Sequence, residues 1–274
     1  MARTGGRQRQ SGGARVEEES ELFVRALARG LSVLALFDIE HPEWSLNDIC
    51  EQTKISKTTV YRMLRTLEAK DFLAYDAVSE KYHLGRANIP IAYLAFSYVG
   101  FVRAARPFLE QLAESTGETV ELAVAGPAGA IVVDQVATKH PFRLNLPTGR
   151  TQNNLAHSAW RVHLAHMRPA EREKFLVRPY YRTMSAHGIG REEALSRLEA
   201  EKAEGVAYDL EELDRGVCAV SVPVFERDGS VRAVLTIVAP AERFSGRGKD
   251  RYTEALKSVA ATLGKALSGQ SIGD

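Results

Sequence analysis

The stretch that most constrains the fold is residues 45–68, SLNDICEQTKISKTTVYRMLRTLE, which predicts two short helices joined by a tight turn. Ser45 can cap the first helix, and Asp48, three residues later, completes an acidic form of the capping box. Ser56 can cap the second helix. That helix then carries apolar residues at helical spacing, which indicates one buried stripe. They are Val60, Met63, Leu64 and Leu67.

The opposite face of the second helix carries hydroxyls, a phenol and guanidinium groups. These side chains are Thr58, Tyr61, Arg62 and Arg65, with Lys57 at the flank. Phosphates attract cations, and base edges are read by short or forked donors, so this face suits a helix laid in a DNA groove. A solvated amphipathic helix in a helical bundle would show the same pattern, and the surrounding sequence has to decide between the two.

The segments on either side of this helix pair favour the DNA interpretation. Residues 21–38 predict a preceding helix, and residues 72–75 and 81–84 predict the strands of a hairpin with a polar loop. Three helices followed by a β-hairpin are typical of a winged helix-turn-helix, so residues 21–84 are predicted to be a DNA-binding domain. The predicted DNA contacts are Arg25, Ser56, Lys57, Thr58, Thr59, Tyr61, Arg62, Arg65, Ser79 and Lys81.

Composition sets limits on the class of protein. The chain has 274 residues, 45% of them hydrophobic and 26% charged, which is the balance of a globular protein with one or two domains. Its net charge is only +1, but residues 54–70 carry five cations against one acid. The two cysteines, Cys50 and Cys218, predict no disulfide framework, and no apolar run approaches the roughly 20 residues that span a bilayer. We therefore expect a cytoplasmic protein with no membrane partner.

Two segments flank the predicted DNA-binding domain. Residues 1–20 have the composition of a disordered tail, which is either a basic arm for a minor groove or merely solubilising. Residues 85–100 are apolar and predict a linker helix. The apolar face of this helix packs either on its own wing or on a second subunit. We favour the second subunit, because DNA-binding proteins of this type usually bind two-fold-related half-sites.

Residues 101–270 predict a second domain. Strand and helix patterns mix there without a regular βαβ repeat, so the fold class is α+β rather than doubly wound. The predicted helices are 101–116, interrupted near Pro107, and 157–167, 191–205 and 251–267. The predicted strands are 119–125, 130–136, 143–146, 219–226 and 230–239.

The chain resembles the isocitrate-lyase-regulator (IclR) family of bacterial transcription regulators over about residues 22–268. The N-terminal resemblance lies in FVRALARGLSVLALF, in SLNDICEQTKISKTTVYRMLRTLEAKDFL and in KYHLG. The C-terminal resemblance lies in GVAYDLEELDRGVCAVSVPVFERDGSVRAVLTIVAP. It implies a winged helix, a linker helix and a GAF-like effector-binding domain, assembled into a homodimer or tetramer that binds double-stranded operator DNA and a small metabolite.

The resemblance also implies where the metabolite binds. The family's pocket positions correspond here to Ser158, Ala159, Asp209, Ala219, Thr236 and Val238, and Leu146 could form a wall. His157 could add a donor, and a carboxylate could lie at the helix start near Ser158; alternatively, Ser158 only caps that helix and Asp209 caps a turn. Residues 152–161 depart from the family pattern, and Trp160 there either stacks on a ring or fills the core. The effector is therefore not transferable by analogy, and organic and aromatic acids are candidates.

No catalytic set, metal site or cofactor motif stands out in the sequence. His163 and His166 are three residues apart, but no cysteine or acid cluster completes a zinc set. Ser221 lacks a nucleophile elbow, and residues 246–249 lack phosphate-loop spacing. We predict a sequence-specific DNA-binding regulator, a repressor modulated by a metabolite, and not an enzyme. Two alternatives stay open: an enzyme that uses the winged helix to contact proteins, and an architectural DNA-binding protein that responds to no ligand.

Overall fold

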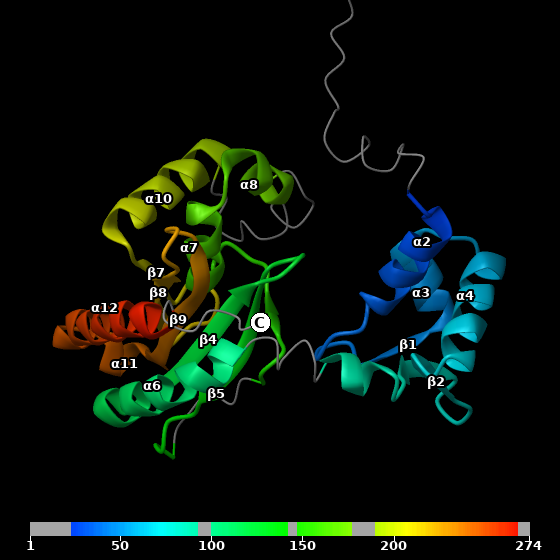
Figure 1. Ribbon diagram of the computed structural model, residues 1–274, viewed down its shortest axis with the longest axis horizontal. Helices are drawn as coiled ribbons and strands as arrows, with labels where there is room; N and C mark the ends of the chain where they lie inside the picture. Colours follow the sequence, from blue (N-terminus) through cyan, green and yellow to red (C-terminus); the bar gives the residue numbers. More distant parts are fainter. Residues whose placement is uncertain (1–22, 93–99, 142–146, 177–189, 268–274) are drawn as a thin grey trace, which may run out of the picture. The chain divides into compact units, whose positions relative to one another are not determined.

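The computed structural model describes residues 23–92, 100–141, 147–176 and 190–267 (Figure 1). The chain divides into two compact units, with the boundary after Ile91. The predicted tail at 1–20, the predicted strand at 143–146 and residues 93–99 of the predicted linker helix lie outside the described residues.

The first unit combines three helices with a small antiparallel sheet. The helices are α2 (Arg25–Leu34), α3 (Leu46–Thr53) and α4 (Lys57–Ala69). The strands are β1 (Glu43–Ser45), β2 (Leu73–Asp76) and β3 (Lys81–Leu84), in the order β1-β3-β2. The predicted winged helix-turn-helix is confirmed, and the predicted two-stranded hairpin gains β1 as a third strand. Trp44 anchors β1, because it pairs with Tyr82 of β3 and its indole Nε1 donates to the Leu36 carbonyl at 2.9 Å.

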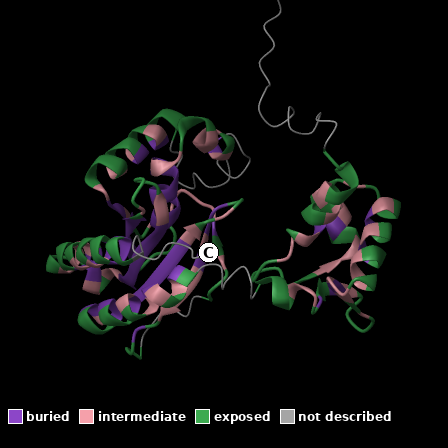
Figure 2. Ribbon diagram, in the orientation of Figure 1, coloured by how far each residue is buried: buried purple, intermediate pink, exposed green. Residues whose placement is uncertain are grey.

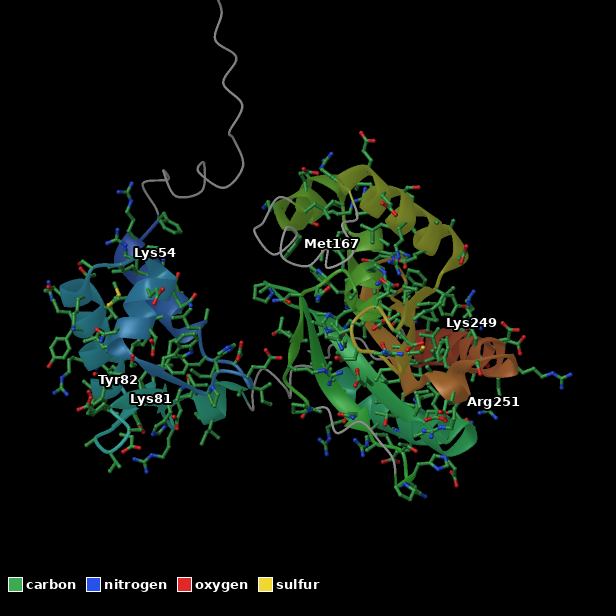
Figure 3. The ribbon with its side chains drawn as sticks, turned by 180° about the vertical axis from the view of Figure 1, so that it is seen from behind. Lys54, Lys81, Tyr82, Met167, Lys249 and Arg251 are labelled. Carbon is green, nitrogen blue, oxygen red and sulfur yellow. The ribbon has the colours of Figure 1, made fainter. Side chains whose placement is uncertain are left out.

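The ends of α3 and α4 follow local sequence signals. Ser45 and Asp48 form the predicted capping box, with the Asp48 backbone N–H donating to Ser45 Oγ at 3.3 Å. Lys54, which is labelled in Figure 3, follows α3. It adopts the left-handed conformation, with a φ of 57°. Ser56 precedes α4 as predicted, but its side chain makes no cap bond to the backbone and instead bonds the Thr59 hydroxyl at 2.9 Å. The predicted side-chain cap at Ser56 is therefore wrong.

The predicted buried stripe of α4 forms the core of this unit. Val60 and Leu64 are fully buried, and Met63 and Leu67 are partly buried against the same cluster. Ile49 of α3 and Val33 of α2 complete the contact between the three helices. The stripe therefore fixes which face of α4 points outward.

The second unit contains a six-stranded antiparallel sheet with the strand order β6-β5-β4-β9-β8-β7. The strands are β4 (Thr119–Ala125), β5 (Ala130–Val136), β6 (Thr151–Gln152), β7 (Ala207–Leu210), β8 (Val217–Phe225) and β9 (Val231–Pro240). The helices are α6 (Gly100–Thr116), α7 (Ser158–His166), α8 (Pro169–Leu176), α10 (Arg191–Glu204), α11 (Ala241–Phe244) and α12 (Arg247–Leu267). The predicted α+β class is confirmed, while β6, β7, α8 and α11 were not predicted.

The sheet lies between two helical layers. Helices α6 and α12 cover one face, and α7 packs on the other with α10 outside it (Figures 1 and 2). Helix α6 continues through Pro107, so the predicted interruption is wrong. Burial of Ala105, Leu109 and Leu112 against the sheet holds this helix together despite the hydrogen bond that proline removes.

The two faces of the sheet differ in chemistry because alternate residues of a strand point to opposite sides. The face toward α6 and α12 is apolar, with side chains such as Val120, Val220 and Leu235 in its core. The face toward α7 carries buried polar side chains at the intervening positions, among them Glu121 and Thr236. Polar groups inside a domain need partners, so this face is the part of the second unit that is suited to a binding site.

Candidate functional site

The outward face of α4 presents the cationic and hydroxyl side chains that the sequence predicts for DNA contact. Lys57, Thr58, Tyr61, Arg62 and Arg65 are exposed there. Arg65 is held by Glu68 at 2.8 Å, whereas Lys57 and Arg62 make no ion pair with any residue that the structure describes. Two free cations beside hydroxyls and a phenol are suited to phosphates and base edges.

Most of the other predicted DNA contacts are partly buried or already bond to groups of the protein. Thr59 is half-buried, and its hydroxyl is shared with the exposed Ser56. On the wing, Ser79 Oγ donates to Asp76 at 2.9 Å, and Lys81 Nζ lies 3.5 Å from a Glu43 carboxylate oxygen. Arg25 is exposed on α2. Ser79 therefore shapes the turn of the wing, while Lys81, labelled in Figure 3, lies in an exposed ion pair that contributes little and breaks easily.

In the second unit, a cavity of about 70 Å³ lies where the N-terminus of α7 meets the sheet. Its floor consists of two neighbouring rows of side chains that run across the strands. In one row, Asp209 of β7 pairs with Ala219 of β8, and Ala219 pairs with Val238 of β9. In the next row, Thr236 of β9 pairs with Glu121 of β4. Strand register thus gathers residues that are far apart in the sequence.

A chain of hydroxyls ties α7 to this floor. Ser158 Oγ lies 2.7 Å from Ser221 Oγ, which lies 2.8 Å from Thr236 Oγ1, and all three residues are buried. Ser158 is the first residue of α7, and His157 occupies the capping position without a side-chain cap bond. The alternative that Ser158 caps this helix is therefore wrong. Because the first N–H groups of a helix have no partner within it, the start of α7 offers donors to a bound acceptor.

An ion pair forms the wall beside the hydroxyl chain. Arg150 Nη2 donates to both carboxylate oxygens of Glu121 at 2.6 Å, and Glu121 is almost fully buried. Gln152 Nε2 approaches the same carboxylate at 3.5 Å. This cluster of a guanidinium, a carboxylate and an amide was missed by the sequence analysis. Glu121 gave a detectable signal, because it is an acid inside the otherwise apolar strand 119–125.

Burial shifts the pKa of two side chains of the cavity. It lowers the pKa of His157 to about 4, with nearby Arg150 acting in the same direction, so this imidazole is neutral at pH 7. It also raises the pKa of the Asp209 carboxyl above its usual value. The Glu212 backbone N–H donates to Asp209 Oδ1 at 2.8 Å, which confirms the alternative that Asp209 caps a turn.

Arg161 fixes the segment that leads into α7. This residue is 1% exposed and donates to Glu201 at 2.8 Å and to the Ala156 carbonyl at 2.9 Å. It also bonds the carbonyls of Leu155 and Tyr208. One buried side chain thereby joins the start of α7 to β7 and α10. Its neighbour Trp160 is buried in the core against Phe175, so the core-filling alternative for Trp160 is confirmed.

Seven of the eight residues predicted to bind an effector line this one cavity. They are His157, Ser158, Ala159, Asp209, Ala219, Thr236 and Val238. The eighth, Leu146, lies outside the described residues. The lining residues that the sequence analysis did not predict are Glu121, Arg150, Gln152, Leu213, Asp214 and Val217.

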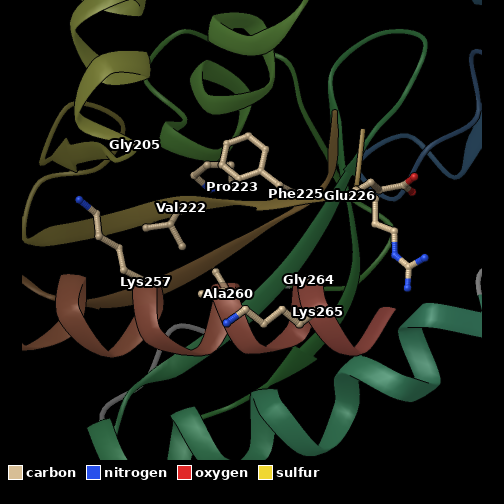
Figure 4. A pocket seen from close by; sticks show the side chains of 11 residues that line it. Gly205, Val222, Pro223, Phe225, Glu226, Lys257, Ala260, Gly264 and Lys265 are labelled. Carbon is tan, nitrogen blue, oxygen red and sulfur yellow. The ribbon is translucent and has the colours of Figure 1, made fainter. Parts of the chain in front are cut away.

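A larger groove of about 660 Å³ lies between the end of β8 and α12 (Figure 4). Val222 and Phe225 of β8 form one side, and Lys257 and Lys265 of α12 form the other. Lys257 Nζ donates to the Glu204 carbonyl at 2.8 Å. In the described part of the chain, no buried polar side-chain atom of this groove lacks a partner. The groove therefore has a larger volume than the cavity at α7, but it has fewer buried polar groups that could orient a ligand.

The described residues show neither a metal cluster nor a membrane-spanning helix. No cluster of three or more His, Cys, Asp or Glu side chains there could hold a metal ion. His163 is buried beside Trp160, and His166 Nδ1 bonds the Val162 carbonyl. In the same residues, no helix is both long and apolar enough to cross a membrane.

Family comparisons match both units. Residues 26–77 match the IclR helix-turn-helix domain, and residues 94–265 match the bacterial transcriptional regulator IclR C-terminal domain. The chain therefore belongs to the IclR family of bacterial transcriptional regulators, as its resemblance predicts. In this family the helix-turn-helix is the DNA-binding part, so the chain is a DNA-binding transcription regulator.

Individual relatives agree over most of their length. The chain is 29% identical to the HTH-type transcriptional regulator KdgR of Dickeya chrysanthemi over 238 residues, covering 85% of this chain and 78% of KdgR. It is 26% identical to the HTH-type transcriptional repressor AllR of Salmonella paratyphi A, covering 92% and 93% of the two chains.

Solved structures share the fold. An IclR family transcriptional regulator from Brucella abortus superposes with a TM-score of 0.80 and 26% identity, covering 94% of this chain and 97% of that one. An IclR homologue from Microbacterium hydrocarbonoxydans, solved with 4-hydroxybenzoate, has a TM-score of 0.68 and 20% identity, covering 89% of this chain and all of that one. At 20% identity, the second likeness concerns the fold alone.

Proposed function

We propose that this regulator is a homodimeric or tetrameric repressor that docks α4 in the major groove of its operator and responds to a small metabolite in the cavity at α7. The observation that carries the proposal is the free cationic face of α4 in a helix-turn-helix whose other face is buried. The regulator acts on DNA in the cytoplasm and is not an enzyme. Repression follows the precedent of AllR, which is named a repressor.

For the DNA contacts, Lys57, Thr58 and Arg62 are the principal residues. Arg62 is exposed and has a forked donor that can bind a guanine or two phosphate oxygens. Ser56, Thr59, Tyr61 and Arg65 support them. Arg25, Ser79 and Lys81 contact phosphate from α2 and the wing, where side chains fix orientation rather than sequence.

For the effector, the cavity at α7 favours a small molecule with an acid group. The free N–H groups at the start of α7 attract an anion, and the buried hydroxyls of Ser158 and Thr236 orient it. A cavity of about 70 Å³ is small beside the roughly 300–1,000 Å³ typical of ligand sites, which favours a compact metabolite. Leu146 remains a proposed wall residue.

For the assembly, apolar side chains on the first unit support a second subunit. Leu27 and Leu31 of α2 are 61% and 55% exposed. Ile89 and Ile91, in the helical residues 88–92, are 65% and 54% exposed. Large apolar side chains in water are unfavourable, and a partner that covers them would align two α4 helices with two half-sites. The effector acts by binding unequally to two arrangements of these helices.

A salt-controlled anisotropy titration tests the proposal with a fragment of the protein's own promoter. Replacing Arg62 with alanine should weaken binding by about 1–3 kcal/mol, or roughly 5–150-fold, and lower the salt dependence. Arg86→Ala is the matched control, because Arg86 lies on the same unit, is exposed and pairs only weakly with Asp71 at 3.4 Å. If Arg62→Ala binds as tightly as the parent, docking through α4 is wrong.

A further inference from the structure

Among the described residues, two buried side-chain atoms of residues that line the α7 cavity have no hydrogen-bond partner: Gln152 Oε1 and His157 Nδ1. Gln152 is 94% buried, since its exposed fraction is 6%, and among the described residues its Oε1 has no hydrogen-bond partner. The orientation of this amide is set by its surroundings, because Nε2 faces the Glu121 carboxylate, which can only accept. Gln152 Oε1 is therefore an acceptor, and a buried unpaired acceptor is costly.

The fixed charges of the cavity also favour a ligand with a donor. Arg150 donates through Nη2 to both carboxylate oxygens of Glu121, and through Nη1 to the Pro147 carbonyl at 3.1 Å. Its guanidinium is thus engaged and balances Glu121, while Asp209 adds a further buried carboxyl group. A ligand with only a carboxylate would bring more negative charge and leave Gln152 Oε1 unpaired. A ligand that also carries a cationic donor would offset the negative charge of its carboxylate and would give Gln152 Oε1 a hydrogen-bond donor.

We propose that the effector is a small 2-amino acid bound as a zwitterion. Its carboxylate accepts from the first backbone N–H groups of α7 and from Ser158. Its ammonium group donates to Gln152 Oε1, next to the Glu121 carboxylate. This inference rests on the proposed effector role of the cavity and narrows the acid to one that carries an ammonium group. The volume of about 70 Å³ limits the side chain to a few atoms.

The test compares acids that share a carbon skeleton. Thermal unfolding of the full-length protein is measured with matched sets of two to six carbons, each containing the 2-amino acid, the 2-hydroxy acid and the unsubstituted acid. A ligand that binds the folded state raises the midpoint. At least one 2-amino acid should raise the midpoint by several degrees at millimolar concentration and change operator binding, whereas its unsubstituted counterpart should do neither.

Substitution of Gln152 separates this contact from general binding. Gln152→Leu keeps an apolar stem but removes the acceptor, so the preference for the amino acid over the unsubstituted acid should fall at least tenfold. Thr151→Val is the matched control, because Thr151 precedes Gln152 on β6 and is exposed. That variant should keep the parent's preference.

The other outcomes separate failure of this inference from failure of the proposed function. If unsubstituted or hydroxy acids bind as well as the amino acids and release DNA, the ammonium contact is wrong while effector control stands. If Gln152→Leu keeps the full preference, the assigned acceptor is wrong. If no member of the sets shifts unfolding while operator binding remains, the inference is overturned and effector control through this cavity loses its support.

Discussion

Arg62 on α4 and Arg161 on α7 are the same residue type on two helices, but their surroundings differ. Arg62 is exposed and has no ion-pair partner in the described part of the chain. Arg161 is 1% exposed and bonds Glu201 and three backbone carbonyls. A cation left in water keeps its capacity for a phosphate, whereas a cation buried among acceptors is committed to the fold. In this molecule, the free cations are the ones that we propose for DNA contact, whereas the engaged cations hold the segments around the cavity in place.

The largest expected effect comes from breaking the buried network. Arg161→Met should lower the free energy of unfolding by about 3–5 kcal/mol, because it removes the donors to three backbone carbonyls and leaves the partly buried Glu201 paired with Arg197 alone at 3.2 Å. Urea titration followed by far-UV circular dichroism measures the change. Arg62→Met is the matched comparison and should change the same free energy by less than about 0.5 kcal/mol. Equal losses in the two variants would remove the contrast between engaged and free arginines.

A second effect concerns a buried titratable group in the same helix. Burial lowers the pKa of His163 to about 4, from an ordinary value of 6.5. As the pH falls, the His163 imidazole is therefore protonated in the unfolded chain before it is protonated in the folded one. The free energy of unfolding then decreases as the pH drops from about 6.5 toward 4. Between pH 7.5 and pH 5, His163 should lower the free energy of unfolding by about 2 kcal/mol.

Urea titrations of the parent and of His163→Leu at both pH values measure this contribution. The variant should lose about 2 kcal/mol less than the parent over the same interval. The raised pKa of Asp209 acts in the opposite direction, because its charged form is disfavoured in the fold, but it is present in both proteins and cancels in the difference. A parallel pH dependence of the two proteins would show that His163 is not held neutral.

A smaller effect is expected for the exposed ion pair of α4. Arg65 and Glu68 lie 2.8 Å apart, and the Arg65 side chain is 61% exposed. Exposed pairs of this kind contribute less than about 1 kcal/mol, so Glu68→Gln should destabilise the protein only slightly. The same change frees Arg65 for DNA, and operator binding should stay equal or become tighter at low salt. Weaker binding by Glu68→Gln would contradict the role given to Arg65.

The smallest effect on stability is expected at Lys57. Lys57→Ala should leave the free energy of unfolding within about 0.5 kcal/mol of the parent, since Lys57 is exposed at the start of α4. Its effect should appear instead in DNA binding, where the slope of log affinity against log salt should fall by about one. Titrations at four salt concentrations measure the slope. An unchanged slope would place Lys57 away from the phosphates.

The first unit could be predicted almost completely from the sequence because its signals are local. The capping residues Ser45 and Asp48 lie within one turn, and the stripe that buries Val60 and Leu64 lies on one helix, so adjacent residues define which face of α4 is free. Strand β1 was missed, since Glu43–Ser45 has only three residues and depends on pairing with β3.

The second unit shows what only the tertiary structure decided. Strand patterns predicted the extents of β4 and β5. The family resemblance predicted six residues that meet in one cavity, and His157 was predicted beside them as a donor. The partners of those residues did not follow from any local pattern. Arg150 meets Glu121 across 29 positions and Ser158 meets Ser221 across 63, because strand register and helix packing bring these segments together. The sequence thus determined which face of α4 is exposed, whereas tertiary packing decided which buried polar groups surround the cavity and which of them have no partner among the described residues.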